Sequence, residues 1–298
     1  MITDVEGVRV GHHTDLDGIT GCTVVLLPAG SRASCAVIGA APDSRQTELL
    51  RPENTVDEVH AIVLTGGSAF GLGCTDGVMA WLAERGVGLP VRDAVVPIVP
   101  TAVLFDLSIG DAKAFPKPDD GRRACAAAAV GFAEGSVGAG TGATVGKWAG
   151  PDYRMKGGIG SASKRSGDVV VGAIVACNAV GDVVDERNEP LAAATCPPGT
   201  PWLLFERSNT VLAVVATNAR LTKGQCAHIA RMGGAGIAQA VRPAHTFGDG
   251  DIVFCAATNA VDADPQVVGS LVADVVADAL RRGVRAATSL GGVSAASA

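Results

Sequence analysis

The chain has 298 residues with 48% hydrophobic and 18% charged side chains, which is typical of a globular protein with a sizeable core and excludes a disordered polar tail. Its 24 basic and 30 acidic side chains give a net charge of −6, which argues against nucleic acid as a partner. No apolar run reaches the ~20 residues of a membrane helix and no basic signal sequence opens the chain, so we expect a cytoplasmic protein with no membrane partner.

The first half of the chain predicts three strands and two helices. Apolar runs predict strands at 22–27, 60–64 and 95–107, the last one interrupted by prolines. Apolar residues at helical spacing predict a buried helix over 68–85 that ends at Gly86. These apolar residues are Phe70, Cys74, Val78, Trp81 and Leu82. An alanine-rich helix is expected over 120–135, with small side chains that allow close packing against a sheet.

The second half alternates strands and helices more regularly. The glycine-dense segment 135–148 is expected to be a loop, and 185–208, rich in Pro, Glu and Arg, is expected to be a linker. Strands are predicted at 168–177, 210–217 and 251–258, and helices at 222–241 and 264–283. Because strands and helices interleave, the predicted fold class is α/β or α+β.

The cysteines and histidines do not predict a metal site. The eight cysteines are dispersed without a C-x-x-C pair, so we expect them to be reduced core residues. Among the five histidines, only His12 and His13 are adjacent, and neighbours in an extended chain point to opposite faces. We therefore expect surface or core histidines and no metal.

The glycine-rich loop does not predict a nucleotide cofactor. A phosphate-binding loop that ended at Lys147 would need glycine at 141 and a hydroxyl residue at 148, whereas the chain has Thr141 and Trp148. A dinucleotide fingerprint fails because Gly138 and Gly140 follow a predicted helix instead of a strand. The G-x-S-x-G motif of α/β-hydrolases is also absent.

One junction offers nucleophilic chemistry. At Ser208-Asn209-Thr210 a polar linker meets an apolar strand at a hydroxyl residue. If the bond before Thr210 were cut, this residue would carry both a hydroxyl nucleophile and a free α-amine with a pKa of ~7.7–8.0, suited to a general base. This combination is that of an N-terminal nucleophile.

Six segments, in the same order, resemble the DmpA-type peptidase family. This family groups L-aminopeptidase/D-esterases, β-peptidyl aminopeptidases and nylon-oligomer hydrolases. The segments are T-G-G-S-A-F-G-L (65–72), V-P-I-V-P-T-A-V-L-F-D-L (96–107), G-S-V-G-A-G-T-G-A-T-V-G-K-W (135–148), K-G-G-I-G-S-A-S (156–163), N-T-V-L-A-V-V-A-T-N-A-R-L-T-K (209–223) and G-D-G-D-I-V-F (248–254).

The resemblance implies a fold, an activity and an assembly. The fold is a four-layer αββα sandwich of the N-terminal-nucleophile-hydrolase type, also found in ornithine acetyltransferase. A single domain over 1–298 would cut itself between Asn209 and Thr210 into chains 1–209 and 210–298, which stay together and form a homotetramer. The mature enzyme would hydrolyse small peptides or amides through an acyl-enzyme on Thr210, without a cofactor.

The resemblance also implies four further catalytic residues. Lys147 matches the active-site lysine, whose charge would favour the neutral amine of Thr210 and stabilise developing negative charge. Asn178 matches the residue whose amide helps to form the oxyanion hole. Asp249 and Asp251 match two polar positions that would share one face and orient the amine and the lysine, with Asp249 the stronger candidate.

The chain differs from this family at two positions. Phe105 stands where several members have a tyrosine near the scissile carbonyl, so one hydrogen-bond donor is lost. Val211 stands where many members have a hydroxyl residue, and we expect it to face the core. Two alternatives remain: an acyltransferase like ornithine acetyltransferase, although its A-T-M-L cleavage motif is missing, and an uncleaved homologue that only binds.

Overall fold

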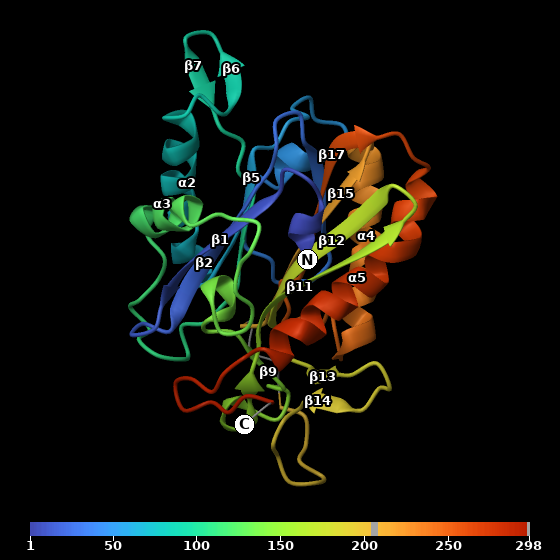
Figure 1. Ribbon diagram of the computed structural model, residues 1–298. Helices are drawn as coiled ribbons and strands as arrows, with labels where there is room; N and C mark the ends of the chain where they lie inside the picture. Colours follow the sequence, from blue (N-terminus) through green and yellow to red (C-terminus); the bar gives the residue numbers. More distant parts are fainter. Residues whose placement is uncertain (204–207, 297–298) are drawn as a thin grey trace.

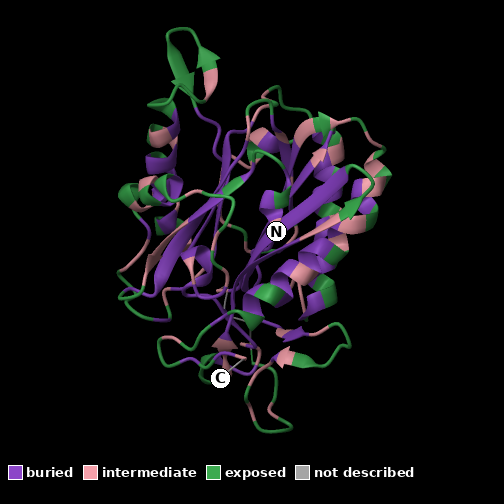
Figure 2. Cartoon of the chain, in the orientation of Figure 1, coloured by how far each residue is buried: buried purple, intermediate pink, exposed green. Residues whose placement is uncertain are grey.

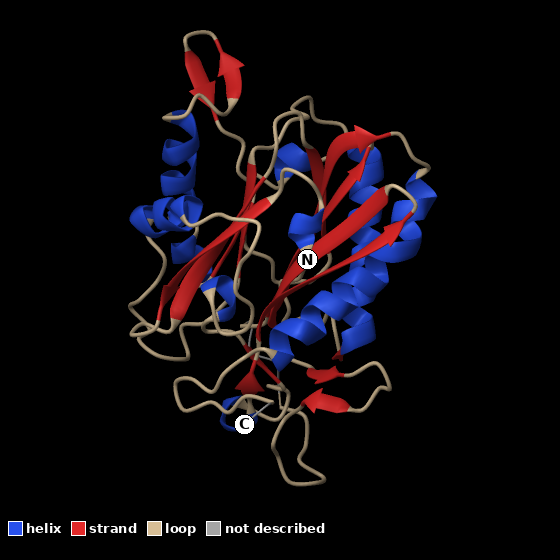
Figure 3. Ribbon diagram, in the orientation of Figure 1, coloured by secondary structure: helices blue, strands red, loops and turns tan. Residues whose placement is uncertain are grey.

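The structure, a computed structural model, describes residues 1–203 and 208–296. Two five-stranded sheets lie face to face, and helices cover the outer face of each sheet (Figures 1 and 3). The result is a four-layer αββα sandwich, as predicted. None of the described helices is long and apolar enough to cross a membrane.

The first sheet is covered by the helices α2 (Cys74–Ala83) and α3 (Pro118–Ala126). Its strands are, in spatial order, β1 (Arg9–Asp15), β2 (Thr20–Leu26), β5 (Ala61–Thr65), β8 (Thr101–Val103) and β4 (Ser44–Arg45). Only β5 and β8 run parallel to each other. The short helix α1 (Ser68–Gly71) precedes α2.

The second sheet is covered by the long helices α4 (Lys223–Ala240) and α5 (Pro265–Arg285). Its strands are, in spatial order, β11 (Gly158–Ser166), β12 (Val169–Asn178), β15 (Thr210–Ala219), β17 (Ile252–Val261) and β3 (Arg32–Val37). β15 and β17 are parallel because α4 forms the crossover between them, and the other pairs are antiparallel.

Smaller elements lie at the two ends of the sandwich and between its two sheets. The hairpin of β6 (Leu89–Val91) and β7 (Ala94–Val96) projects at one end, and the others gather near the C-terminus or in the connections (Figure 1). These others are β9 (Thr144–Val145), β10 (Met155–Lys156), β13 (Asp182–Val184), β14 (Pro190–Ala192) and β16 (Val241–Arg242), with the 3-10 turns η1 (Ile2–Asp4), η2 (Glu48–Leu50), η3 (Gly138–Gly140) and η4 (Pro151–Tyr153).

Three apolar layers hold the sandwich together. One fills the space between the sheets, and the other two lie between each sheet and its helices. All ten residues of β12 are buried, and β15 is buried along nearly its whole length (Figure 2). Strands buried on both faces have apolar residues at successive positions without alternation, which is why the segments 168–177 and 210–217 could be predicted as strands.

The predicted C-terminal helices are confirmed. Thr222 caps α4 by accepting a hydrogen bond from Gln225 N at 3.2 Å, and Asp264 caps α5. The apolar stripe of α5 faces the second sheet, so the burial of apolar side chains and the capping hydrogen bond both stabilise this helix.

Three element predictions are corrected. The helix expected over 68–85 is divided into α1 and α2, and Phe70 lies outside the core, where it is 64% exposed and stacks on Phe115. The helix expected over 120–135 ends at Ala126, since the following chain pairs with β1 through Val10 and Ala129. The linker expected over 185–208 includes β14, and its residues 204–207 lie outside the described residues.

Candidate active site

Thr210 is the first residue of β15, at the end of the central strand of the second sheet. Only 5% of the residue is exposed. Its hydroxyl donates a short hydrogen bond to the carbonyl oxygen of Asn209, and the N–H of Gly250 donates to the same oxygen at 2.8 Å. Two donors therefore polarise the carbonyl group at the predicted cleavage site.

The register of the sheet determines which residues surround Thr210. In the antiparallel pair of β12 and β15, Thr210 lies opposite Asn178. On the other side, Asn209 forms an isolated parallel bridge with Asp249. Val211 faces the apolar core and is 1% exposed, as predicted. The sheet thus brings three residues from distant parts of the sequence to one strand end.

Lys147 and Asn178 form one hydrogen-bonded unit beside this strand end. Lys147 Nζ lies 2.9 Å from Asn178 O, 3.0 Å from Asn178 Oδ1 and 3.5 Å from Ser208 O. The amide of Asn178 donates to Ser208 O at 3.2 Å and to Phe105 O at 3.0 Å. Because Oδ1 of Asn178 also accepts from Thr144 N at 2.9 Å, the amide orientation is fixed.

Burial changes the charge state of Lys147. Removal of the ammonium from water lowers the pKa of Lys147 to about 7, although the negative charge of Asp249 opposes this effect. A lysine with this pKa exists in both protonation states near neutral pH. It can therefore accept a proton as well as stabilise negative charge, whereas the sequence predicts only the charged form.

The two aspartates occupy separate hydrogen-bonded positions. Asp249 accepts from Thr246 N at 2.8 Å and from Thr246 Oγ1 at 2.6 Å. Asp251 accepts from Val211 N at 2.6 Å, so it is bound to the residue that follows Thr210. Both aspartates are 1% exposed, and desolvation together with the charge of Asp251 raises the pKa of Asp249.

His245, which the sequence predicts to be an ordinary surface or core histidine, also belongs to this site. Its Nδ1 lies 2.7 Å from Asp251 Oδ2, and its Nε2 lies 3.1 Å from Gly234 O. Burial opposes protonation of the ring, but Asp251 outweighs it, so the pKa of His245 is raised. The only signal in the sequence is its position six residues before Asp251.

Phe105 contributes its backbone to the site. Its carbonyl oxygen accepts the hydrogen bond from Asn178, and its aromatic ring cannot donate one. The next residue, Asp106, is 3% exposed and binds Gly67 N at 2.7 Å and Thr20 Oγ1 at 2.8 Å. Burial raises the pKa of Asp106 to about 6. These bonds fix the chain on one side of Asn178.

A second buried lysine supports the glycine-rich loop. Lys156 is fully buried, and its Nζ donates to Thr141 O at 2.6 Å and to Ala143 O at 2.9 Å. Burial lowers the pKa of Lys156 to about 7, and the negative charge of Asp106 opposes this. Lys156 therefore binds two carbonyl groups of the loop that leads to Lys147 and holds this loop in place.

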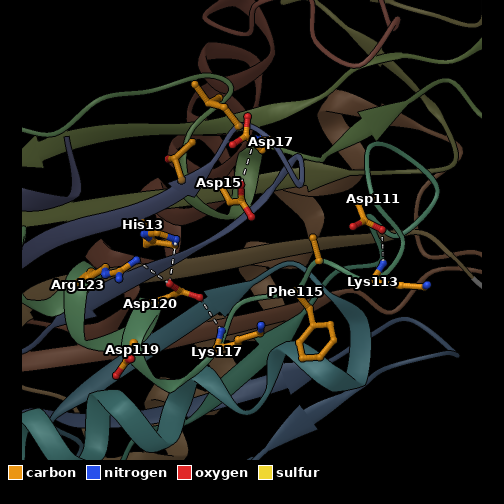
Figure 4. Close-up of a pocket in the computed structure, with 13 residues that line it drawn as sticks. His13, Asp15, Asp17, Asp111, Lys113, Phe115, Lys117, Asp119, Asp120 and Arg123 are labelled. Atoms are coloured by element: carbon orange, nitrogen blue, oxygen red, sulfur yellow. Dashed lines mark hydrogen bonds and ion pairs between the residues drawn. The ribbon is translucent and has the colours of Figure 1, made fainter.

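A separate pocket of about 750 Å³ lies between residues 13–17, at the end of β1, and the segment 111–123 (Figure 4). Charged side chains of both signs line it, and His13 lies 3.1 Å from Asp120. His12 instead lies 2.9 Å from Thr23 Oγ1, so the two adjacent histidines have different partners. None of the five predicted catalytic residues lines this pocket, and no group of three potential metal ligands occurs among the described residues.

The whole chain is similar to proteins of one peptidase family. The family model of Peptidase family S58 matches residues 1–297. An uncharacterized aminopeptidase of Mycobacterium tuberculosis is 39% identical over 98% of this chain and 95% of its own length. A 6-aminohexanoate-oligomer endohydrolase of Agromyces sp. is 31% identical over 87% of this chain and 75% of its own length.

Solved structures show the same fold. A β-aminopeptidase of Burkholderia sp. superposes with a TM-score of 0.76 at 24% identity, over 99% of this chain and 90% of that one. An L-aminopeptidase D-Ala-esterase/amidase of Ochrobactrum anthropi, described as a variant of the Ntn hydrolase fold, gives 0.77 at 21% identity, over 98% and 87%. The predicted fold and hydrolase class are confirmed, and the chain belongs to Peptidase family S58.

Proposed function

We propose that this chain cleaves itself between Asn209 and Thr210 and that the new N-terminal threonine then hydrolyses small peptides or amides. The observation that carries the proposal is the position of the Thr210 hydroxyl, which is buried and hydrogen-bonded to the carbonyl group that it would attack. Gly250 N–H binds the same carbonyl oxygen and would stabilise the negative charge that develops there.

Self-cleavage requires an acyl shift followed by hydrolysis. The hydroxyl oxygen of Thr210 attacks the carbonyl carbon of Asn209 and loses its proton to a base. The C–N bond breaks, and the nitrogen of Thr210 gains a proton, so that an ester joins the two residues. Water then hydrolyses the ester, which leaves a carboxylate on Asn209 and a free hydroxyl and amine on Thr210.

Lys147 is the proposed base for this first reaction. With its pKa lowered to about 7, its neutral amine is available at neutral pH. It binds Asn178, which lies opposite Thr210 in the sheet, and it also contacts Ser208 O in the segment before the cut. After proton transfer, the charge of Asp249 would stabilise the ammonium form.

In the mature enzyme the same hydroxyl would attack the substrate. The free amine of Thr210 accepts the hydroxyl proton, an acyl-enzyme forms, and the amine of the substrate leaves with a proton. Water then releases the acid and frees the hydroxyl. The amide of Asn178 supplies a donor for the tetrahedral intermediate, while Asp249 and Asp251 hold the segment around Thr210.

The relatives indicate the substrate class. One relative is named as an uncharacterized aminopeptidase and another as a 6-aminohexanoate-oligomer endohydrolase, and both names denote hydrolysis of amide bonds. This agreement favours hydrolysis over transfer of the acyl group to an amine, the reaction of the ornithine acetyltransferase alternative.

The proposal also includes a homotetramer located in the cytoplasm. Light scattering tests the assembly, and cell fractionation tests the location.

Replacement of the nucleophile tests both reactions together. Thr210→Ala removes the hydroxyl, so we expect a single chain of 298 residues without amidase activity. Thr210→Ser retains a hydroxyl and should still give fragments 1–209 and 210–298. Intact-mass measurement shows the cut, and hydrolysis of short peptide amides shows the activity. Cleavage of Thr210→Ala at the same bond, or a wild-type protein that stays uncut and only binds, would exclude the proposal.

A further inference from the structure

His245 is joined through one carboxylate to the strand that begins with Thr210. Its Nδ1 lies 2.7 Å from Asp251 Oδ2, and its backbone N–H donates to the same oxygen at 3.3 Å. The other carboxylate oxygen, Oδ1, accepts from Val211 N at 2.6 Å. Asp251 therefore bridges the histidine and the first peptide group after Thr210.

The surroundings of the imidazole ring favour its cationic form. Its Nε2 lies 3.1 Å from Gly234 O on α4, so each ring nitrogen faces an oxygen atom that accepts hydrogen bonds, and a ring that donates from both nitrogens is protonated. Burial alone would lower the pKa of His245, but the hydrogen bond to Asp251 and the charges of Asp251 and Asp249 outweigh burial and raise this pKa. With the carboxylate side chain only 1% exposed, the two groups form a buried ion pair.

Asp251 also lies close to the atom that would become the free amine of the mature enzyme. Three covalent bonds separate Val211 N from Thr210 N, so Asp251 Oδ1 lies within about 7 Å of this nitrogen. A carboxylate at this distance stabilises an ammonium group and raises the pKa of the amine. Asp249, which forms a bridge with Asn209, adds a second carboxylate on the same side. The two carboxylates together would make the amine a cation at neutral pH, and a cation cannot act as the base.

The charged groups near this strand end lie on both sides of β15. On the side of β12, burial together with the nearby charge of Arg154 lowers the pKa of Lys147. On the side of β17, Asp249 and Asp251 precede the strand, and His245 binds Asp251. Within the described part of the chain, only His245 forms an ion pair with either aspartate. Loss of its charge would therefore leave both carboxylates without a cation in contact.

We propose that His245 is a positioning residue of the mature enzyme: its cation pairs with Asp251 and offsets the two carboxylates, so that the Thr210 amine is neutral near pH 7 and can accept the hydroxyl proton. The proposal rests on the proposed function, because it concerns the second reaction of that site. It goes beyond that function by assigning a role to a histidine that does not contact the reacting atoms.

The test measures the protonation of the Thr210 amine in wild type, His245→Gln and His245→Lys. Each protein first matures, and intact mass confirms its two fragments. Trace acetic anhydride, which acetylates neutral amines, is then applied over a range of pH, and acetylation of Thr210 in fragment 210–298 is followed by mass. Peptide mapping separates Thr210 from Lys223, the only lysine of this fragment.

The two variants separate the charge of His245 from its hydrogen bond. Gln can still donate to Asp251 but carries no charge, so the midpoint of acetylation should rise by about one pH unit. Lys retains the charge and should give a midpoint close to that of wild type. His228→Gln is the matched control, because His228 is exposed on α4 and should leave the midpoint unchanged.

The activity of His245→Gln gives a second readout. Because less of the amine is neutral, hydrolysis of short peptide amides should fall about tenfold at pH 7. It should return to the wild-type rate about two pH units higher, where the amine is neutral in both proteins. A merely structural role of the histidine would lower the rate at both pH values.

Three results would overturn this inference and leave the proposed function intact. They are an unchanged midpoint in His245→Gln, an equal rise in the Gln and Lys variants, and a Gln variant that stays uncut although wild type is cut. The last result would place the histidine in the first reaction instead of the second. A wild-type chain that is never cut would overturn both proposals.

Discussion

At the scale of single residues, the site depends on buried polar groups that have partners. Lys147, Asn178 and the two aspartates each make the hydrogen bonds described above, so their burial does not leave orphaned polar atoms on these side chains. The desolvation that makes the ammonium of Lys147 a stronger acid also makes its neutral form available near pH 7. Such a shift is typical of groups that transfer protons.

The first prediction concerns the pH dependence of self-cleavage. Deprotonation of Lys147 creates the base, so the wild-type rate should rise with pH through about 7 and then level off. Lys147→Met should lower the rate about 100-fold or more and abolish this inflection. Lys147→Arg should be equally slow because a guanidinium does not deprotonate. The uncut fraction is followed by intact mass at several pH values.

The surface lysine Lys164, which binds Asp274 and Asp278, supplies the matched control. Lys164→Met should leave both the rate and its pH profile unchanged. A flat wild-type profile, or a Lys147→Arg protein that cleaves normally, would contradict the assignment of Lys147 as the base.

At the scale of elements, direct contact between two backbones holds helix α5 against strand β11. A Cβ added to Gly160 would lie 2.1 Å from Gly283 N, and one added to Gly283 would lie 2.6 Å from Gly160 N. The two backbones therefore touch, which only glycine allows at this crossing. This contact explains part of the high glycine content of the chain, 39 of 298 residues.

The second prediction tests this contact. Gly160→Ala must push α5 away from the sheet, so it should lower the free energy of unfolding by about 1–3 kcal/mol. Gly131→Ala is the control, because a Cβ there meets nothing within 4 Å, and its effect should stay within about 0.5 kcal/mol. Urea unfolding in the uncut Thr210→Ala background measures both. Equal stability of the two variants would contradict the packing argument.

At the scale of the whole molecule, the two expected fragments are interleaved in one sheet. Fragment 210–298 provides β15 and β17, which lie between β12 on one side and β3 on the other, both from fragment 1–209. Backbone ladders join these pairs along eight and six residue positions. The apolar layer between the sheets also includes residues of both fragments.

The third prediction follows from this topology. After self-cleavage the fragments should remain together in every native separation. Parting them would expose the edge of β15 that pairs with β12, the edge of β17 that pairs with β3, and the apolar layers that cover this sheet. Native size-exclusion chromatography should give one peak that contains both fragments, and a denaturing gel should give two bands. Separation of the fragments in dilute native buffer would show that the interleaved sheet does not hold them.

Residue order predicts those elements whose own residues carry a local signal. The runs 168–177 and 210–217 are apolar because the strands are buried on both faces, and α4 and α5 have caps and a periodic apolar stripe. The six family-like segments also identified the fold and the hydrolase class. The roles of Thr210, Lys147, Asn178, Asp249 and Asp251 stay predictions that the experiments above test.

Features that depend on contacts between distant segments become visible only in the folded chain. The truncation of the second predicted helix at Ala126 results from pairing with β1, and Phe70 stacks on Phe115 outside the core. The bond of His245 to Asp251, the lowered pKa of Lys147 and the stack of Trp202 on Trp148 likewise need the folded chain. Desolvation and stacking are properties of the space around a side chain, and residue order alone does not specify that space.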